Sequence, residues 1–221
     1  MTIFFILPLI PLTGGIFTLV NYFRQKDTSL LINVFSGLLF ACAWLAAFKY
    51  KAPLSFGVAF FKSENNVIYQ IELDIDNLAL FMVVLVSSIS FFVHQFASRY
   101  LRSDLTQGRF MAQLSLLTAA VIFLVMGGNL LTIFLAWEFV GLTLYLLLNH
   151  YHYDQRANRA AKKEFIINRL GDMAFMVALC LCNTYFKSSE LSVLASSPIV
   201  LWQFLGWYVS VQYLVVFLIF I

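Results

Sequence analysis

Long runs of uncharged, apolar residues dominate this sequence, and they decide what the chain can fold into. A helix needs about 20 predominantly apolar residues to cross a bilayer. Six runs come close to or reach that length: Ile3–Tyr22, Leu30–Phe48, Asn77–Ala97, Met111–Met126, Leu130–Asn149 and Glu164–Phe186. A seventh begins near Ile199 and is still apolar at Ile221. We therefore predict an all-α polytopic membrane protein with six complete transmembrane helices and a seventh at the carboxyl end.

Composition points the same way. Of the 221 residues, 62% are hydrophobic and 11% are charged, whereas soluble domains carry roughly 25% charged residues. The net charge of +3 lies mainly in loops and does not indicate nucleic-acid binding. Cys42, Cys180 and Cys182 form no C-x-x-C pair, and no glycine-rich nucleotide motif is present. We expect no metal, no cofactor and no redox centre in this chain.

Two local signals interrupt the helical pattern. Apolar and polar residues alternate towards the end of 56–75, after turn-forming residues at 63–66, which predicts a β-hairpin between the second and third helices. Its open edges exclude it from the lipid, so we place it outside the bilayer. Gly127 and Gly128 then separate the fourth helix from the fifth, with Asn129 as the expected N-cap of the fifth.

The basic residues predict an orientation. Nine lie in the loops after the first, third and fifth helices: Arg24, Lys26, Arg99, Arg102, Arg109, Arg156, Arg159, Lys162 and Lys163. The opposite side has four: Lys49, Lys51, Lys62 and Lys187. Since basic loops stay in the cytoplasm, we expect the amino terminus and hairpin outside and the loop His150–Glu164 inside. The membrane would be a bacterial or organelle inner membrane.

The last run ends at Ile221 without a polar flank. We expect the chain to be a piece of a longer protein. The alternative is a short protein that ends at the membrane surface, because Ile199–Ile221 is just long enough to span.

Glu138 is the most informative single residue, because it lies well inside the fifth predicted helix. A charged residue at a helix centre costs about 2.5–3.5 kcal/mol on insertion scales and usually serves an ion or proton pathway. Gly141 and Tyr145 follow on the same helix face, where Tyr145 could offer a hydroxyl. We interpret Glu138 as a proton carrier; the alternative is a carboxyl buried for packing alone.

Other ionisable residues are weaker candidates. Arg169 and Asp172 stand three residues apart in the sixth helix, either as an ion pair that controls charge near Glu138 or as an interfacial pair. His94 near the end of the third helix is either a proton relay or an interfacial aromatic residue. His150 and His152 lack a third metal ligand and fit an interfacial belt.

After these residues, a family resemblance becomes visible. The stretches NLLTIFLAWEFVGLTLYLLL and AAKKEFIINRLGD, within Asn129–Asp172, resemble the antiporter-like subunits of respiratory complex I (subunit L or chain 5). The segments IELDIDNLALF, VHQFASRYLRSD and GRF, between Ile71 and Phe110, resemble that family's amino-terminal module. The resemblance implies an amino-terminal module at 1–110 and the start of a proton-channel repeat at 111–221.

The resemblance also implies roles for residues. Glu138 falls on the family's fifth-helix glutamate, which pairs with a seventh-helix lysine expected just after Ile221. Arg169 and Asp172 fall on the family's sixth-helix arginine and aspartate, and His94 falls on a recurrent histidine of the third helix.

The implied function is a proton-translocating subunit of an NADH:quinone oxidoreductase with an intramembrane Glu/Lys path. Its partners would be other membrane subunits and a redox or soluble protein supplied by other chains. One alternative is the membrane subunit of a two-part inorganic-carbon uptake system, which Phe139 and the SRYL at 98–101 keep open. Others are the large subunit of a multisubunit Na⁺/H⁺ antiporter and a non-conducting remnant or assembly element.

Overall fold

Six long helices build the molecule. A computed structural model describes residues 2–24, 29–49, 54–62, 68–190, 193, 201–204 and 207–219. The helices are α1 (Thr2–Phe23), α2 (Ser29–Lys49), α3 (Asn77–Tyr100), α4 (Gln107–Val125), α5 (Leu130–Leu148) and α6 (Gln155–Phe186). All six are long and apolar enough to cross a membrane. The prediction of a six-helix polytopic membrane protein is confirmed.

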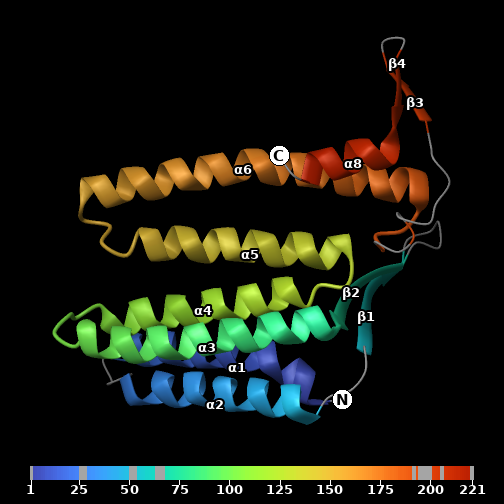
Figure 1. The fold of residues 1–221 in the computed structure, drawn as a ribbon. Coiled ribbons are helices and arrows are strands. Elements are labelled where there is room, and N and C mark those ends of the chain that lie inside the picture. Colours follow the sequence, from blue (N-terminus) through green and yellow to red (C-terminus); the bar gives the residue numbers. More distant parts are fainter. Residues whose placement is uncertain are drawn as a thin grey trace.

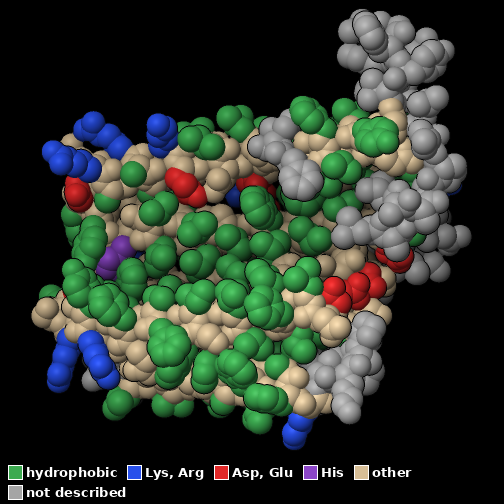
Figure 2. Space-filling model, in the orientation of Figure 1, with side chains coloured by type: hydrophobic (Ala, Val, Ile, Leu, Met, Phe, Trp, Pro, Cys, Tyr) green, Lys and Arg blue, Asp and Glu red, His purple; other side chains and the backbone are tan. Residues whose placement is uncertain are grey.

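The helices lie side by side along one common direction (Figure 1). Helix α4 is central, because it packs against α1, α3 and α5, while α6 contacts α5 on the far side. Figure 2 shows Lys and Arg side chains mostly at the end with the α3–α4 and α5–α6 turns, and one group of acidic side chains at the opposite end, with a few more along the α6 side. A broad hydrophobic surface separates the two ends.

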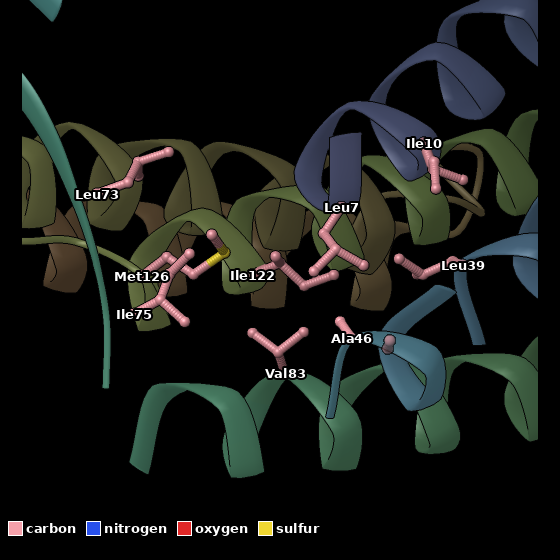
Figure 3. Packing of buried hydrophobic residues seen from close by; sticks show 10 residues of the cluster. Leu7, Ile10, Leu39, Ala46, Leu73, Ile75, Val83, Ile122 and Met126 are labelled. Atoms are coloured by element: carbon pink, nitrogen blue, oxygen red, sulfur yellow. The ribbon is translucent and has the colours of Figure 1, made fainter. Parts of the chain in front are cut away.

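The two larger apolar clusters hold most of the bundle together. One joins α1, α2, α3 and α4 through residues such as Leu7, Leu39, Val83 and Ile122 (Figure 3). The other joins α5 and α6 to a short terminal helix. Lipid is as apolar as leucine, so close packing rather than transfer from water has to hold such helices together. Gly15 illustrates this, since an added Cβ would lie 3.1 Å from a backbone oxygen of α4.

The predicted hairpin forms and is anchored to the bundle. Strand β1 (Leu54–Lys62) pairs antiparallel with β2 (Ile68–Ile75), while the expected turn at 63–66 lies outside the described residues. The Gly128 N–H donates to the Glu72 carbonyl (2.8 Å), and the Asp74 N–H donates to the Met126 carbonyl (2.8 Å). Strand β2 is therefore fastened to the break between α4 and α5.

Asn129 caps α5 as predicted and also binds the hairpin. Its Oδ1 accepts from the Thr132 N–H (2.8 Å), and its Nδ2 donates to the Gln70 carbonyl (2.8 Å). The Thr132 hydroxyl in turn accepts from the Glu72 N–H (2.9 Å). One asparagine therefore fixes both the start of α5 and the position of β2.

Two boundaries differ from the sequence prediction. Helix α6 begins at Gln155 instead of Glu164, because Asp154 caps it by accepting from the Arg156 N–H (2.8 Å). The expected loop at 150–164 is therefore mostly helical.

The seventh helix also begins later than predicted. A short antiparallel pair, β3 (Leu201–Phe204) and β4 (Trp207–Ser210), comes first, and α8 (Val211–Ile219) follows. The predicted end points Ile199 and Ile221 lie outside the described residues. The reason for the error is that hydropathy alone does not separate an apolar helix from an apolar strand, and aromatic residues favour the strand.

Candidate functional site

A charged cluster lies between α5 and α6. The Arg169 Nη2 atom of α6 lies 2.5 Å from the Glu138 Oε2 atom of α5. The Arg169 Nε atom lies 3.5 Å from the Asp172 Oδ2 atom one turn along α6. The spacing of three residues brings Arg169 and Asp172 to one face of the helix. One guanidinium is therefore shared between two carboxylates on two neighbouring helices.

The three side chains differ in burial. The Asp172 side chain is 7% exposed, Glu138 is 22% exposed and Arg169 is 42% exposed. The Trp137 and Glu138 side chains also face the Asp172 carboxyl. The Arg169 guanidinium lies over the Phe165 ring, 5.1 Å from its centroid, which adds a cation–π contact. Asp172 is thus held inside the helix pair, while Arg169 reaches the surface of the bundle.

The face predicted to carry Glu138, Gly141 and Tyr145 does point towards α6. A Cβ added at Gly141 would lie 3.8 Å from the Asn168 Nδ2 atom, an ordinary contact distance, so this position faces α6 but a larger residue would also fit. The Tyr145 ring packs against Phe165 with centroids 5.1 Å apart. Within the described residues, Tyr145 makes no hydrogen bond to Glu138, so its contribution here is packing.

Sequence reasoning missed one part of this interface. The Asn168 Nδ2 group donates to the Glu164 Oε1 atom at 2.5 Å, and the second Glu164 oxygen is buried without a partner among the described residues. A signal was available, because Glu164, Asn168 and Asp172 recur every four residues and so share one helix face. The polar face of α6 therefore runs from Asp172 to Glu164, over about two turns of the helix.

The structure does not bring His94 to this cluster. His94 is buried between α3 and α4, where its Nδ1–H donates to the Ser90 carbonyl (2.7 Å). The Ser115 hydroxyl lies 3.4 Å from Nε2. The Ser90 hydroxyl continues the network to the Thr118 hydroxyl (2.8 Å). His94 is therefore not an interfacial aromatic residue, because its ring is enclosed by neutral hydrogen-bonding groups.

Acidic residues line a cavity of about 760 Å³ at the hairpin end, among them Glu72, Asp74, Asp76 and Glu190. Burial raises the pKa of Glu72, and the neighbouring Asp74 and Glu190 raise it further. Burial also raises the pKa of Asp74, with Asp76 and Glu190 adding to the effect. These carboxylates repel one another, so this end of the molecule favours bound protons more than isolated carboxylates would.

Within the described residues, no group of three or more His, Cys, Asp or Glu side chains could hold a metal ion. The absence of a cofactor stays a prediction. Glu138, Arg169, Asp172, Tyr145 and His94 have now been placed, and their roles in transport stay predictions as well.

Two family models match the chain. Residues 127–221 match the model described as NADH:quinone oxidoreductase/Mrp antiporter, and residues 61–111 match the model for the amino terminus of chain 5 of NADH-ubiquinone oxidoreductase (complex I). The first match contains the whole α5–α6 pair, and the second contains β2 and α3.

Curated relatives agree with these models. The chain is 33% identical over 200 residues to NADH-quinone oxidoreductase subunit L of Pseudomonas aeruginosa, covering 85% of this chain and 32% of the relative. It is 33% identical over 177 residues to NADH-ubiquinone oxidoreductase chain 5 of Metridium senile, covering 77% of this chain and 29% of the relative. The chain thus spans about a third of the length of these relatives.

Solved structures share the fold. A chain of the Mrp complex from a Dietzia species superposes with a TM-score of 0.72 at 18% identity, covering 88% of this chain and 22% of that one. A chain of an archaeal membrane-bound sulfane sulfur reductase superposes with a TM-score of 0.75 at 16% identity, covering 89% of this chain and 40% of that one.

Proposed function

Since this chain belongs to the antiporter-like family of membrane subunits represented by complex I chain 5 and Mrp-type antiporters, we propose that it moves protons across the membrane, with Glu138 as the proton carrier. The membrane-spanning helices and the family membership support the location of the chain in a membrane. The cluster of Glu138, Arg169 and Asp172 supports the mechanism.

The observation that carries this proposal is one cation placed between two carboxylates inside two membrane-spanning helices. Arg169 stays protonated at all relevant pH values, so the proton has to reside on a carboxyl group. When Glu138 takes up a proton, its attraction to Arg169 falls and the guanidinium is left to Asp172. When Glu138 releases the proton, the short contact with Arg169 re-forms. Arg169 would therefore alternate between two partners as Glu138 loads and unloads.

The exposure of Arg169 supports a partner subunit at this interface. A guanidinium that is 42% exposed within a membrane-spanning helix would meet hydrocarbon if lipid covered it, which costs several kcal/mol. A second membrane subunit with polar groups, or a hydrated space between subunits, would remove that cost. We propose that such a subunit covers the α5–α6 face, that the basic turns face the cytoplasm and that the hairpin lies outside.

The decisive experiment compares Glu138→Gln with Asp76→Asn. Glutamine keeps the shape of the side chain but cannot carry a proton. Asp76→Asn also removes one negative charge, at a site where asparagine still caps α3. Inverted membrane vesicles that contain the chain in its native complex are assayed for proton uptake with a pH-sensitive dye. We expect at least a tenfold loss for Glu138→Gln, about 1.4 kcal/mol or more in the transport barrier, and little change for Asp76→Asn.

Chain abundance in the vesicles is measured by immunoblot and used to normalise each rate. Normal proton uptake by Glu138→Gln at normal abundance would overturn the proton-carrier role and favour a non-conducting structural element. Loss of uptake in both variants would point to a general charge effect instead.

A second candidate is exchange of protons for sodium ions, because the matching family model covers Mrp antiporters as well as NADH:quinone oxidoreductases. The same vesicles separate the two. Proton movement on addition of NADH supports a subunit of an NADH:quinone oxidoreductase, whereas proton movement on a sodium pulse without NADH supports an antiporter.

A further inference from the structure

Two turns meet at the basic end of the bundle, one between α3 and α4 and one between α5 and α6. The His150 Nε2 atom lies 3.0 Å from the Thr106 hydroxyl oxygen. The Tyr151 hydroxyl donates to the Asp104 Oδ2 atom (3.0 Å). These side-chain contacts join segments that are more than forty residues apart in the chain. The turns are therefore fastened to each other directly.

The direction of each hydrogen bond can be assigned. The Asp104 Oδ1 atom accepts from the Thr106 N–H (2.8 Å) and from the Thr106 hydroxyl (2.7 Å). These bonds hold the pKa of Asp104 below its ordinary value, so the carboxylate is ionised and can only accept. The single Thr106 hydroxyl hydrogen is thus used, and Thr106 must accept from His150. The bond between the two turns therefore requires that His150 carries a hydrogen on Nε2.

The other ring nitrogen of His150, Nδ1, is enclosed by the protein. His150 is 5% exposed, and its Nδ1 atom is buried without a hydrogen bond among the described residues. The ring is packed edge-to-face against Phe110, with centroids 5.2 Å apart, and against Tyr151 at 4.7 Å. A neutral ring fits this place, because its bare Nδ1 needs no acceptor. A protonated ring would bury an N–H group that has none.

We propose that Asp104, Thr106 and His150 form a pH-sensitive latch, which is closed while His150 is neutral and opens when His150 is protonated. The latch fixes the α3–α4 turn to the end of α5, the helix that carries Glu138. It does not depend on the proposed proton transport, and it would operate in a non-conducting chain as well.

The charges around His150 determine the sign of the response. Burial lowers the pKa of His150 most, Arg109 and His152 lower it further, and Asp104 alone raises it. An open turn would return His150 to water and an ordinary pKa of about 6.5. The open form therefore binds protons more readily than the closed form. The closed latch is favoured above the ordinary histidine range and weakens as the pH falls through and below it.

Two exposed positions allow the latch to be measured without altering it. Leu105 is 95% exposed and Tyr153 is 89% exposed, one on each turn. Spin labels on Leu105→Cys and Tyr153→Cys, in a chain whose Cys42, Cys180 and Cys182 are replaced by alanine, report the distance between the turns. In lipid nanodiscs, we expect one short distance near pH 8 and a second, longer distance near pH 5. The ratio of closed to open should fall by up to about tenfold per pH unit.

Two histidine variants on the same turn form a matched pair. In His150→Gln the amide can still donate to Thr106 but cannot be protonated, so the short distance should persist at both pH values. His152→Gln removes the neighbouring imidazole and should respond to pH like the parent. A parent distance that does not change with pH, or a His150→Gln chain that still responds, would overturn the proposal.

The tautomer gives a test that leaves the latch residues intact. Nitrogen-15 spectra of labelled histidine in the parent chain distinguish hydrogen on Nε2 from hydrogen on Nδ1. We expect His150, assigned by its loss in His150→Gln, to carry hydrogen on Nε2 near pH 8. Hydrogen on Nδ1 at that pH would contradict the assigned direction of the Thr106 bond and overturn the latch.

Discussion

The α3–α4 and α5–α6 pairs both bring polar side chains together inside membrane-spanning helices, but by different chemistry. Between α3 and α4, His94 lies among serine and threonine hydroxyls and a backbone carbonyl. Between α5 and α6, one guanidinium lies between two carboxylates. The first network is neutral, and each of its hydrogens has an acceptor. The second is charged, with one cation for two anions.

This difference indicates which pair is suited to move a proton. The Nδ1–H of His94 donates to the Ser90 carbonyl, and a further proton on Nε2 would face the Ser115 hydroxyl, with no carboxylate bonded to the ring among the described residues. The α5–α6 cluster can gain a proton on Glu138 and still leave Arg169 paired with Asp172. A buried polar network that is neutral and fully hydrogen-bonded adds rigidity. A cluster with one cation and two carboxylates can take up a proton on one carboxylate and still keep an ion pair.

The largest effect is expected from Arg169→Met, which leaves Glu138 and Asp172 facing each other without a cation. Removing one partner of a buried ion pair costs about 3–5 kcal/mol, and the exposure of Arg169 should reduce this to about 1–3 kcal/mol. Proton uptake should be lost, and the apparent melting temperature in detergent should fall. The melting temperature is measured on the purified chain, and proton uptake is measured on vesicles.

The triple variant Glu138→Gln, Arg169→Met, Asp172→Asn separates stability from transport. It removes all three charges at once, and neutral replacement of a buried charge cluster is often tolerated. We expect most of the melting temperature to return while proton uptake stays absent. Recovery of uptake in the triple variant would show that these charges do not carry the proton.

His94→Ala tests the other half of the comparison. It leaves the Ser115 hydroxyl without its partner and opens a cavity between α3 and α4, which should cost about 1–3 kcal/mol. The melting temperature should fall, but proton uptake per folded chain should remain near the parent value. His94→Asn, which can keep a donor near the Nδ1 position, should lose less stability. A complete loss of uptake by His94→Asn at normal abundance would restore His94 as a relay.

The sequence allowed much of this fold to be predicted, because the constraints are local. Helices that span a bilayer need long apolar runs, and six of them were located from hydropathy. The cap at Asn129 and the alternation before Ile75 followed from side-chain chemistry and a period of two. The start of α6 at Gln155 was missed, since charged residues after Asp154 are typical of a loop and of a solvated helix end alike. The β3–β4 pair was missed because an apolar run rich in aromatic residues is typical of a membrane helix and of a strand alike.

The candidate site was predicted less completely. Helical spacing placed Arg169 beside Asp172 and gave Glu138 a shared face with Gly141, but it could not show which neighbouring helix that face would meet. The contact between Glu138 and Arg169 is a tertiary contact between α5 and α6. The burial of His94 and His150 depends on tertiary packing too, and a sequence carries no direct signal of it.

Substitution of Asn129 is expected to lower stability by an intermediate amount, because Asn129 links both helix pairs at the hairpin end. Asn129→Ala removes the cap of α5 and the bond to the Gln70 carbonyl, which should cost about 1–2 kcal/mol. Asn129→Asp keeps the cap but cannot donate to Gln70, so its loss should be smaller. Thermal unfolding measures both, and hydrogen exchange at the start of α5 should rise more in the alanine variant. Equal losses in the two variants would show that the hairpin bond, and not the cap, is the important one.

The smallest change in melting temperature is expected at the two ends of the bundle, where the pKa values of carboxyl groups are shifted in opposite directions. The pKa of Glu72 is raised, mainly by burial, so its protonated form is favoured in the folded chain and stability rises as the pH falls through the carboxyl range. The pKa of Asp104 is lowered by its bonds from Thr106, so its contribution to stability is present above that range and is lost as the pH falls.

Glu72→Gln should therefore raise the melting temperature slightly near pH 8, and Asp104→Asn should lower it. Both differences should shrink near pH 4, where the carboxyl groups titrate. Shifts of the same sign near pH 8 would mean that net charge, rather than the local surroundings of each carboxyl, sets the stability of the two ends.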